Sequence, residues 1–348
     1  MTTANATPIT DAQTSTAPKM VKYPITVFND GLLNPFPDAA KEKKIVGFHP
    51  KSKHSIPTPS KMGITFSAEF LRDLIVFLNN PRGFALMITG ETGSGKTTGV
   101  LEAGAYLNWP VREYACTGDH EHGSLRGQFQ FKSAKPGEPP AMTFVHGALA
   151  KAMRNGEILL INEFDMGSPE ELAGLNDVLA GRPLVIEENG DEIIYPHPMF
   201  RIIATGNSNG GGDETGDYAG VQSQNMATMD RFRVIKKPYM STDEEIAVIE
   251  KATDGKIPTA IAAQMVEVAQ SFRSLYLQKQ LSRTMSTRSL VHWAFLMVDY
   301  NGAQNANGDS IIISYTVQRC FMNHLRSDEV DAAKRIVSDQ FADGVQWD

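Results

Sequence analysis

The middle of the chain alternates short apolar runs with segments whose apolar residues recur at helical spacing. Four apolar runs and the segment 110–114 predict five strands, at 84–89, 110–114, 157–161, 200–205 and 231–235. Helical spacing or good helix formers predict helices at 67–78, 97–107, 146–153 and 169–179. Strands that alternate with helices indicate a parallel sheet covered by helices, so the predicted fold class is α/β.

Two further features complete this pattern. The runs 183–187 and 192–195 flank Asn189-Gly190, which is a strong signal for a β-hairpin. Beyond Pro238 the pattern becomes helical, with helices expected at 243–251, 260–276, 288–298, 310–325 and 329–341. We therefore predict an α/β domain over residues 61–238 and a small helical lid domain over residues 239–348.

The first sixty residues lack a sustained period. Residues 1–22 are mainly small and polar with few large apolar side chains, a composition typical of a disordered tail. In residues 23–60 apolar residues are scattered among Pro, Gly and Lys. This segment is expected to be an irregular arm, and docking on a neighbouring subunit and a plain linker both stay open.

The amino-acid composition excludes some classes of protein but does not identify the function. The 348 residues are 41% apolar and 21% charged, as in an ordinary globular protein large enough for two domains. The net charge of −7 argues against a large non-specific surface for nucleic acid. Two cysteines give no disulfide framework and suit a reducing cytoplasm. No apolar stretch approaches the roughly 18 residues of a membrane span, and the N-terminus lacks a signal-peptide pattern.

A phosphate-loop motif follows the strand predicted at 84–89. The segment Gly90-Glu91-Thr92-Gly93-Ser94-Gly95-Lys96-Thr97 fits G-x-x-x-x-G-K-[ST], and Thr98 continues into the predicted helix. Glycines let the backbone turn its N–H groups around phosphate oxygens, and the positive end of the helix adds to that field. We expect this loop to bind ATP, with Lys96 on the β- and γ-phosphates and the Thr97 hydroxyl on Mg²⁺.

A second group of polar residues ends the strand at 157–161. Asn162, Glu163 and Asp165 come directly after its apolar residues. Phosphate-loop enzymes use carboxylates at this position to act on Mg²⁺ and on the attacking water. Since the carboxyl ends of parallel strands meet at one edge of a sheet, these residues are expected beside the phosphate loop.

The order of motifs resembles that of the MoxR group of AAA+ ATPases, and is most similar to its cobaltochelatase CobS branch. The resemblance extends over roughly residues 64–325. It is carried by the phosphate loop and by the segments 107–110, 161–165, 196–198, 204–216, 229–232 and 282–288. Phosphate loops alone are widespread, but this combination in this order is specific.

The resemblance implies further roles, each tied to a matching position. Glu163 would polarise the attacking water, and Asn207 would be the sensor that orients it. Arg231 would be an arginine finger supplied to the ATP of the neighbouring subunit, and Arg288 in the lid would be a second sensor at the γ-phosphate. These roles suit phosphoryl transfer, which depends on positioning and on stabilising charge in the transition state.

The same resemblance implies partners. An arginine supplied in trans requires a homo-oligomeric ring, of six subunits as is usual in the group. In the CobS branch the partners are a von Willebrand A-domain subunit and a large chelatase subunit that inserts Co²⁺ into a corrin ring. Arg126, Gln128 and Phe129 stand where the family places a loop that faces the client. We expect no association with a membrane.

One departure concerns the metal. The family normally has Asp where this chain has Asn162, and an amide brings no negative charge to Mg²⁺-bound water. We therefore expect weaker Mg²⁺ binding or slower turnover, with ATP binding retained. Asp165 lies past the strand end and is not expected to compensate.

Two other clusters have weaker claims to a metal. Cys116, His120 and His122 offer only three ligands close in sequence for zinc, and a solvated polar loop is the simpler interpretation. Asp213, Glu214 and Asp217 lack the twelve-residue spacing and terminal Glu of a calcium loop. Neither cluster is expected to bind a metal.

Three functions follow as hypotheses. The first is a ring-forming, Mg²⁺-dependent ATP hydrolase that remodels a partner protein or complex. The second is a nucleic-acid-stimulated NTPase motor, which the acidic balance disfavours. The third is an assembly protein that binds ATP but turns it over slowly because of Asn162.

Overall fold

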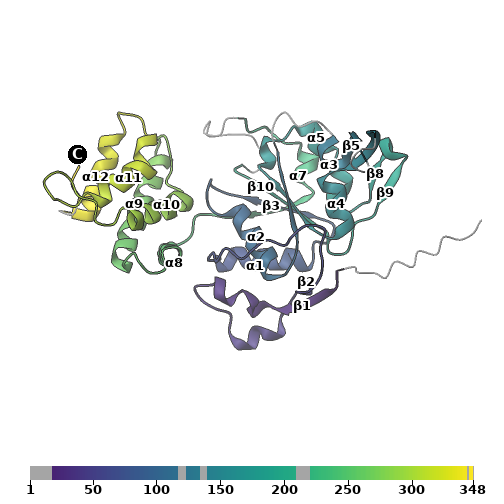
Figure 1. Cartoon of the computed structure of the whole chain (residues 1–348), viewed down its shortest axis with the longest axis horizontal. Coiled ribbons are helices and arrows are strands. Elements are labelled where there is room, and N and C mark those ends of the chain that lie inside the picture. The colour runs from purple at the N-terminus through teal and green to yellow at the C-terminus, as the bar shows by residue number, and fades with distance from the viewer. Residues whose placement is uncertain (1–17, 117–122, 134–138, 209–219, 343–344, 348) are drawn as a thin grey trace, which may run out of the picture.

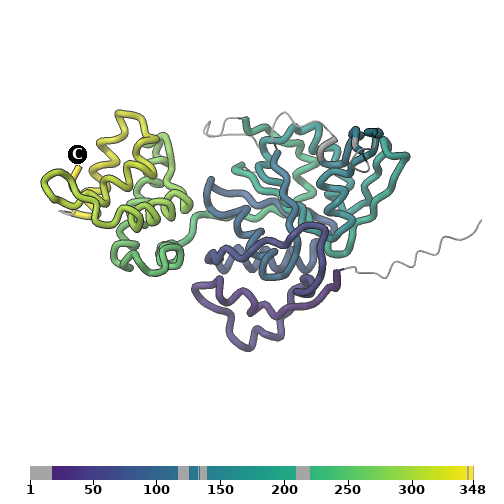
Figure 2. The backbone as a smooth tube through the Cα atoms, viewed as in Figure 1, coloured from purple at the N-terminus to yellow at the C-terminus, as the bar shows by residue number. Residues whose placement is uncertain are grey.

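The computed structural model describes residues 18–116, 123–133, 139–208, 220–342 and 345–347. In this part of the chain an α/β core carries a helical domain on one side and an N-terminal segment beneath helices α1 and α2 (Figure 1). The backbone crosses from the core to the helical domain through the short segment that joins β11 to α8 (Figure 2).

A five-stranded parallel sheet forms the centre of the core. Its strand order is β11-β3-β10-β7-β4, and every neighbouring pair is parallel. The strands are β3 (Ala85–Thr89), β4 (Val111–Ala115), β7 (Ile158–Asn162), β10 (Arg201–Gly206) and β11 (Phe232–Lys236). All residues of β3 and β10 are buried, as expected for a parallel sheet covered on both faces. The predicted α/β fold is thus confirmed.

Helices cover this sheet, and most begin where apolar spacing predicts them. They are α1 (Ala68–Asn79), α2 (Lys96–Tyr106), α3 (Gly123–Arg126), α4 (Ala148–Asn155), α5 (Pro169–Ala173), α6 (Asn176–Leu179) and α7 (Met226–Met229). The helix expected over 169–179 is two short helices, because the chain breaks at Gly174, a poor helix former, and Leu175. The helix expected from His146 begins two residues later, since His146 ends a strand.

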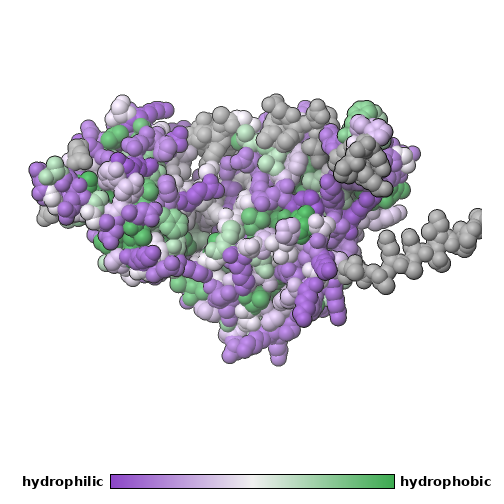
Figure 3. Space-filling view, viewed as in Figure 1, coloured by the Kyte–Doolittle hydropathy of each residue, from purple (hydrophilic) through white to green (hydrophobic). Residues whose placement is uncertain are grey.

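Two antiparallel hairpins project from the core. The predicted hairpin around Asn189-Gly190 is present as β8 (Leu184–Ile186) and β9 (Glu192–Ile194). The other, β5 (Gly127–Lys132) paired with β6 (Ala141–His146), was not predicted. Three of its apolar side chains are exposed, namely Phe129, Phe131 and Met142. Hydrophobic atoms accordingly appear at the edge of the molecule near β5 (Figure 3).

The N-terminal segment differs from the irregular arm expected over residues 23–60. Strand β1 (Met20–Pro24) pairs with β2 (Lys44–Phe48), and β1 also crosses the boundary of the expected tail at residue 22. Phe28, Ile45 and Phe48 are fully buried in the same hydrophobic cluster as α1 and α2. The scattered apolar residues therefore belong to the core, although no single element displays them at a regular period.

The C-terminal helices form a domain with its own core. They are α8 (Thr242–Ala252), α9 (Thr259–Leu277), α10 (Thr287–Asp299), α11 (Ile312–Cys320) and α12 (Val330–Phe341). Trp293 and Phe272 are fully buried in one cluster shared by these helices. The helical lid is thus present as predicted. Nowhere in the described residues is there a helix with the length and apolar character needed to cross a bilayer.

Candidate functional site

The phosphate loop joins β3 to α2 at the carboxyl edge of the sheet. Gly90 and Gly93 have φ angles of 148° and 71°, which L side chains rarely adopt. A Cβ on Gly90 would lie 2.2 Å from the Lys237 carbonyl oxygen, and one on Gly93 would lie 2.5 Å from Ser286 Oγ. Only glycine therefore lets the loop pass between the end of β11 and the lid.

Lys96 points back across the loop. Its Nζ donates to the carbonyl oxygens of Gly90 and Glu91 and, at 2.9 Å, to Asn207 Oδ1 at the end of β10. Burial lowers the Lys96 pKa to about 8, assisted by the positive charges of Arg288 and Lys237 and opposed by Asp165 and Glu91. The ammonium is thus held at a desolvated position that a phosphate oxygen would stabilise.

Thr97 and Asn162 meet at the expected metal position. Thr97 Oγ1 donates to Asn162 Oδ1 at 2.7 Å, and Thr205 Oγ1 donates to the same oxygen at 3.2 Å. The Asn162 amide in turn donates to Glu113 Oε2 at 3.1 Å. The hydroxyl, the amide oxygen and a nearby carboxylate are oxygen donors of the kind Mg²⁺ takes, so these residues fit the ion.

Glu163 follows β7 in a strained conformation. Its φ and ψ are 55° and 46°, in the left-handed region that non-glycine residues rarely occupy. The residue is exposed at the carboxyl edge of the sheet, next to Asn162. Such backbone strain persists only when the surroundings impose it, and it is common at active sites.

Asp165 is fully buried beneath the end of β10. Its Oδ2 accepts hydrogen bonds from the backbone N–H groups of Asn207 and Ser208 at 2.8 and 2.9 Å. The segment after β7 is therefore bonded directly to the residue expected to act as sensor. We did not expect Asp165 to compensate for Asn162. Its hydrogen bonds give it a different role, which is to hold Asn207 in place.

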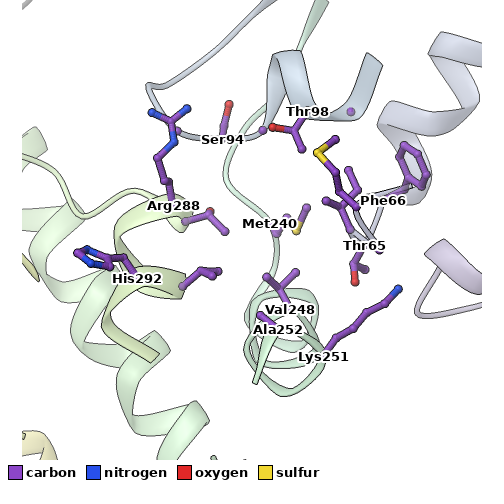
Figure 4. Close-up of a pocket in the computed structure, with 18 of the residues that line it drawn as sticks. Thr65, Phe66, Ser94, Thr98, Met240, Val248, Lys251, Ala252, Arg288 and His292 are labelled. Atoms are coloured by element: carbon purple, nitrogen blue, oxygen red, sulfur yellow. The ribbon is translucent and has the colours of Figure 1, made fainter. Parts of the chain in front are cut away.

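A cavity of about 820 Å³ lies between the phosphate loop, the segment 62–66 and the lid. Arg288 and His292 of α10 line one side, and Val248 and Ala252 of α8 line another (Figure 4). The exposed Arg288 side chain lies beside Ser94 of the phosphate loop (Figure 4). Its charge lowers the pKa of Lys96, so the two cations act on the same region.

Arg231 lies away from the group around Lys96. It precedes β11, and its guanidinium donates to the carbonyl oxygen of Ala227, the second residue of α7. Its Nε is buried and has no hydrogen-bond partner among the described residues. Within one subunit the structure thus brings together Lys96, Thr97, Asn162 and Asn207, with Glu163 adjacent, but not Arg231. The catalytic and sensor roles of these residues stay predictions.

Of the two alternative metal clusters, only Cys116 lies within the described residues. Cys116 is buried, and burial raises the pKa of its thiol to about 12, which disfavours the thiolate that a metal requires. His120 and His122 lie outside the described residues, as do Asp213, Glu214 and Asp217. Among the residues that are described, no cluster of three or more His, Cys, Asp or Glu side chains could hold a metal.

Glu113 and Lys237 belong to the site but were not predicted from the sequence. Asp165 was noted there, but its contact with Asn207 and Ser208 was not predicted. Glu113 reaches Asn162 because β4 pairs with β7, with Ala115 opposite Asn162. Lys237 reaches the phosphate loop because β11 pairs with β3. These contacts depend on the order of the strands in the sheet, and local sequence patterns do not reveal that order.

Two family models match the chain in succession. An AAA domain of the dynein-related subfamily matches residues 85–232, and a CbbQ/NirQ/NorQ C-terminal model matches residues 245–325. The first therefore spans four of the five strands of the parallel sheet and ends at the first residue of β11, and the second spans most of the lid.

Curated relatives agree with these models. The aerobic cobaltochelatase subunit CobS of Sinorhizobium sp is 31% identical over 224 residues, which are 63% of this chain and 65% of the relative. The chain thus spans just under two thirds of that relative. An uncharacterized protein of Staphylococcus haemolyticus is 32% identical over 207 residues, 59% of this chain and 75% of that protein.

A solved structure shares the fold. The P216G mutant of RuvB from Thermotoga maritima superposes with a TM-score of 0.50 at 13% sequence identity. The superposition covers 78% of this chain and 75% of that one. At this identity the likeness concerns the fold alone.

Proposed function

Because the chain belongs to the MoxR group of AAA+ ATPases, near the cobaltochelatase subunit CobS, we propose that it is a ring-forming, Mg²⁺-dependent ATP hydrolase that remodels a partner protein or complex. One observation carries the hydrolase part. Lys96 donates to Asn207 and Thr97 donates to Asn162 at the carboxyl edge of the sheet. The two donors belong to α2, whereas Asn162 ends β7 and Asn207 follows β10. Phosphoryl transfer depends on positioning such groups around the phosphates, which supports the proposal.

Each residue has a distinct task in this proposal. The backbone of the phosphate loop and Lys96 bind the phosphates, and Glu163 accepts the proton of the attacking water while Asn207 orients it. Thr97 would bind Mg²⁺ directly and Asn162 would bind it through water, while Glu113 supplies a nearby negative charge. When bound, Mg²⁺ neutralises the charge that develops on the transferred phosphate.

The arginine finger makes the site depend on assembly. In our proposal Arg231 leaves the Ala227 carbonyl and reaches the ATP of the neighbouring subunit. Its partly unsatisfied guanidinium supports this, because the buried Nε has no hydrogen-bond partner in the part of its own chain that the structure describes.

Mixing two inactive variants tests both the hydrolysis and the ring. Glu163→Gln should bind ATP without hydrolysis, and Arg231→Ala should do the same. When the two are mixed in equal amounts, roughly a quarter of the interfaces in a ring combine an intact Glu163 with an intact Arg231. Regained ATPase activity, with a ring of about six subunits by light scattering in ATP, is the expected result.

A mixture of Lys96→Ala with Glu163→Gln is the matched control. Both changes damage the same half of the site but leave every arginine in place, so no interface in that mixture is complete. A protein that stays monomeric with ATP, or that does not bind ATP, contradicts the proposal.

The client would contact the β5–β6 hairpin. Its exposed Phe129, Phe131 and Met142 form an apolar edge that monomeric proteins seldom leave uncovered. We expect a von Willebrand A-domain protein among the partners, by analogy with the CobS branch. Capture with Glu163→Gln in ATP should retain that partner, and capture with Glu163→Gln/Phe131→Ser should lose it.

A nucleic-acid-stimulated motor is the second candidate, and one observation favours it. Between Lys19 and Lys61 the chain has eight lysines against three acidic residues. All eight lysines are exposed, so the N-terminal segment has a basic surface although the net charge of the chain is negative. Duplex DNA at low salt should stimulate hydrolysis if this candidate is correct. Unchanged rates with DNA leave the protein-remodelling proposal, and a negligible rate in both assays indicates an ATP-gated assembly protein.

A further inference from the structure

Lys237 is a buried residue with its backbone fixed against the phosphate loop. It follows directly after β11, and its N–H donates to the Thr89 carbonyl oxygen at 2.7 Å. Only 3% of the residue is exposed. Its carbonyl group packs against Gly90 so closely that no side chain fits there. The residue therefore has a fixed place beside the nucleotide site.

The end of the Lys237 side chain lies in the wall of the cavity. Its Cε is 3.6 Å from the position of a Cβ on Gly95, and its Nζ is 4.5 Å from the centre of the Phe70 ring. Gly95, Phe70 and Lys237 all line the cavity. The ammonium thus lies between the phosphate loop and α1, in the wall of the cavity that also reaches the lid.

The charge of Lys237 has little compensation within the chain. Among the described residues, neither a hydrogen bond nor an ion pair involves its Nζ, and the contact with the Phe70 ring is its one close interaction. Burial lowers the Lys237 pKa to about 8, opposed only by Glu244. A charge on a largely buried lysine is costly without an anion beside it, so an anionic ligand in the adjoining cavity would stabilise its charged form.

The two lysines of the site face different regions. Lys96 bonds to Asn207 on the side of the sheet, where the far end of the polyphosphate is expected. Lys237 faces the cavity, whose other walls include the apolar side chains of Ile64, Val291 and Phe295. These apolar walls suit a base and ribose. The anion next to Lys237 would thus be the phosphate that joins them to the rest of the nucleotide.

We propose that Lys237 is a second phosphate-binding residue of this site, whose ammonium binds the phosphate nearest the ribose of a nucleoside phosphate. The inference rests on the proposed function, since it requires that the cavity takes a nucleotide. Because nucleoside mono-, di- and triphosphates all have this phosphate, Lys237 should contribute to the binding of all three.

The test measures the binding of ATP, ADP and AMP to the full chain by calorimetry. Lys237→Met removes the charge but keeps the length, and should weaken binding of all three nucleotides by about tenfold, as for the loss of one charged hydrogen bond. Lys237→Arg should keep most of the affinity. Lys236→Met is the matched control, because Lys236 is the exposed neighbour on β11, and its affinities should equal those of the wild type.

Thermal unfolding separates this role from a structural one. Without nucleotide, Lys237→Met should be as stable as the wild type or more so, because a buried charge is gone. With ADP it should gain a smaller rise in Tm than the wild type. Should the methionine variant fold poorly, Lys237→Gln allows the same comparison against its own nucleotide-free Tm.

Two results would overturn the inference. Wild-type affinity of Lys237→Met for all three nucleotides removes any role in binding, and a loss confined to ATP places the ammonium at the far phosphate instead. Both results assume that the wild-type chain binds ADP. A wild type that binds no nucleotide contradicts the proposed function itself, so the two failures are distinguishable.

Discussion

At the scale of single residues, Asn162 occupies the position where the MoxR group normally has aspartate. Its amide oxygen accepts from Thr97 and Thr205, and its amide nitrogen donates to Glu113. An aspartate could keep the two accepted bonds but not the donated one. The asparagine therefore bridges two hydroxyls and a carboxylate without adding charge to the metal position.

Restoring the charge should speed hydrolysis. Asn162→Asp places a second carboxylate next to Glu113, and Mg²⁺ between them offsets their repulsion. We expect a higher steady-state rate of ATP hydrolysis at saturating Mg²⁺. An unchanged or lower rate would show that the amide, and not the charge, suits this site.

Glu113 should matter more in the natural chain than in that variant. Glu113→Gln removes the carboxylate that is bonded to Asn162, and should raise the Mg²⁺ concentration that half-saturates ATP binding by roughly tenfold. In the Asn162→Asp background the same change should have a smaller effect, since the two carboxylates are coupled. Fluorescent-nucleotide titrations with Mg²⁺ measure both, and Glu188→Gln is an exposed control. Equal effects in the two backgrounds would rule out the coupling.

The lowered lysine pKa values predict the pH dependence of nucleotide binding. Lys96 and Lys237 both have pKa values of about 8 because of burial, and a bound phosphate favours their charged forms. Above that pKa, binding must take up protons, so ADP affinity should fall as pH rises from about 7.5 to 9.5. The slope should be shallower for Lys237→Met, which retains only Lys96. Calorimetry across this range measures it, and a flat profile for the wild type would contradict the assignment.

The sequence revealed those parts of the site that lie in contiguous motifs. Gly90 to Thr97 and Asn162-Glu163 could be identified because their spacing alone defines their chemistry. Glu113 and Lys237 could not, because each reaches the site only through the pairing of neighbouring strands. Lone charged residues without a motif look the same as solvated surface residues.

At the scale of elements, helix α8 shows how a local sequence can specify a boundary. Ser241 Oγ accepts from the Glu244 N–H, and Glu244 Oε2 accepts from the Ser241 N–H, which forms a capping box. The start expected for this helix, residue 243, lies within one residue of the observed start at Thr242. Caps and turns of this kind are readable because they involve residues only three apart.

Loss of this cap should destabilise the lid. Ser241→Ala leaves the first N–H groups of α8 without their side-chain acceptor, and should lower the free energy of unfolding by about 1 kcal/mol. Ser271→Ala, inside α9, is the control and should be neutral or slightly stabilising, since alanine is the best helix former. Urea unfolding of both variants provides the comparison. Equal stabilities would mean that solvent replaces the cap without loss.

The β5–β6 hairpin shows where element prediction failed and why. Residues 127–132 alternate polar and apolar side chains, with Gln128 before Phe129 and Gln130 between Phe129 and Phe131. This alternation is a strand signal, but it stands close to a Pro-rich stretch that is typical of a loop. A projecting hairpin has no core face to impose a simple pattern.

At the scale of the whole molecule, the N-terminal segment belongs to the hydrophobic core of the α/β domain. The Phe28 ring lies 5.8 Å from that of Phe66 and 5.2 Å from that of Tyr106, which belongs to α2. The sequence could not reveal this, because Phe28 stands in a short 3-10 turn among prolines and polar residues. Its partners are tens of residues away along the chain.

A single substitution in this segment should weaken the entire domain. Phe28→Ala removes a fully buried ring, and should lower the free energy of unfolding by about 3–5 kcal/mol. Phe131→Ala removes an equal ring that is 71% exposed, and should change stability little. Denaturant unfolding of the two variants compares them. A small effect for Phe28→Ala would mean that the segment detaches without cost to the rest.

The shared packing of Phe28, Ile45 and Phe48 has a practical consequence for anyone who expresses this protein. The similarity to known families starts near residue 64 or 85, and those points invite a shortened clone. A clone that starts near residue 64 would leave α1 and α2 with an exposed apolar face, and one that starts near residue 85 would also lack α1. Either clone would be expected to precipitate. The safe cut lies before Met20, well upstream of the first residue that the families recognise.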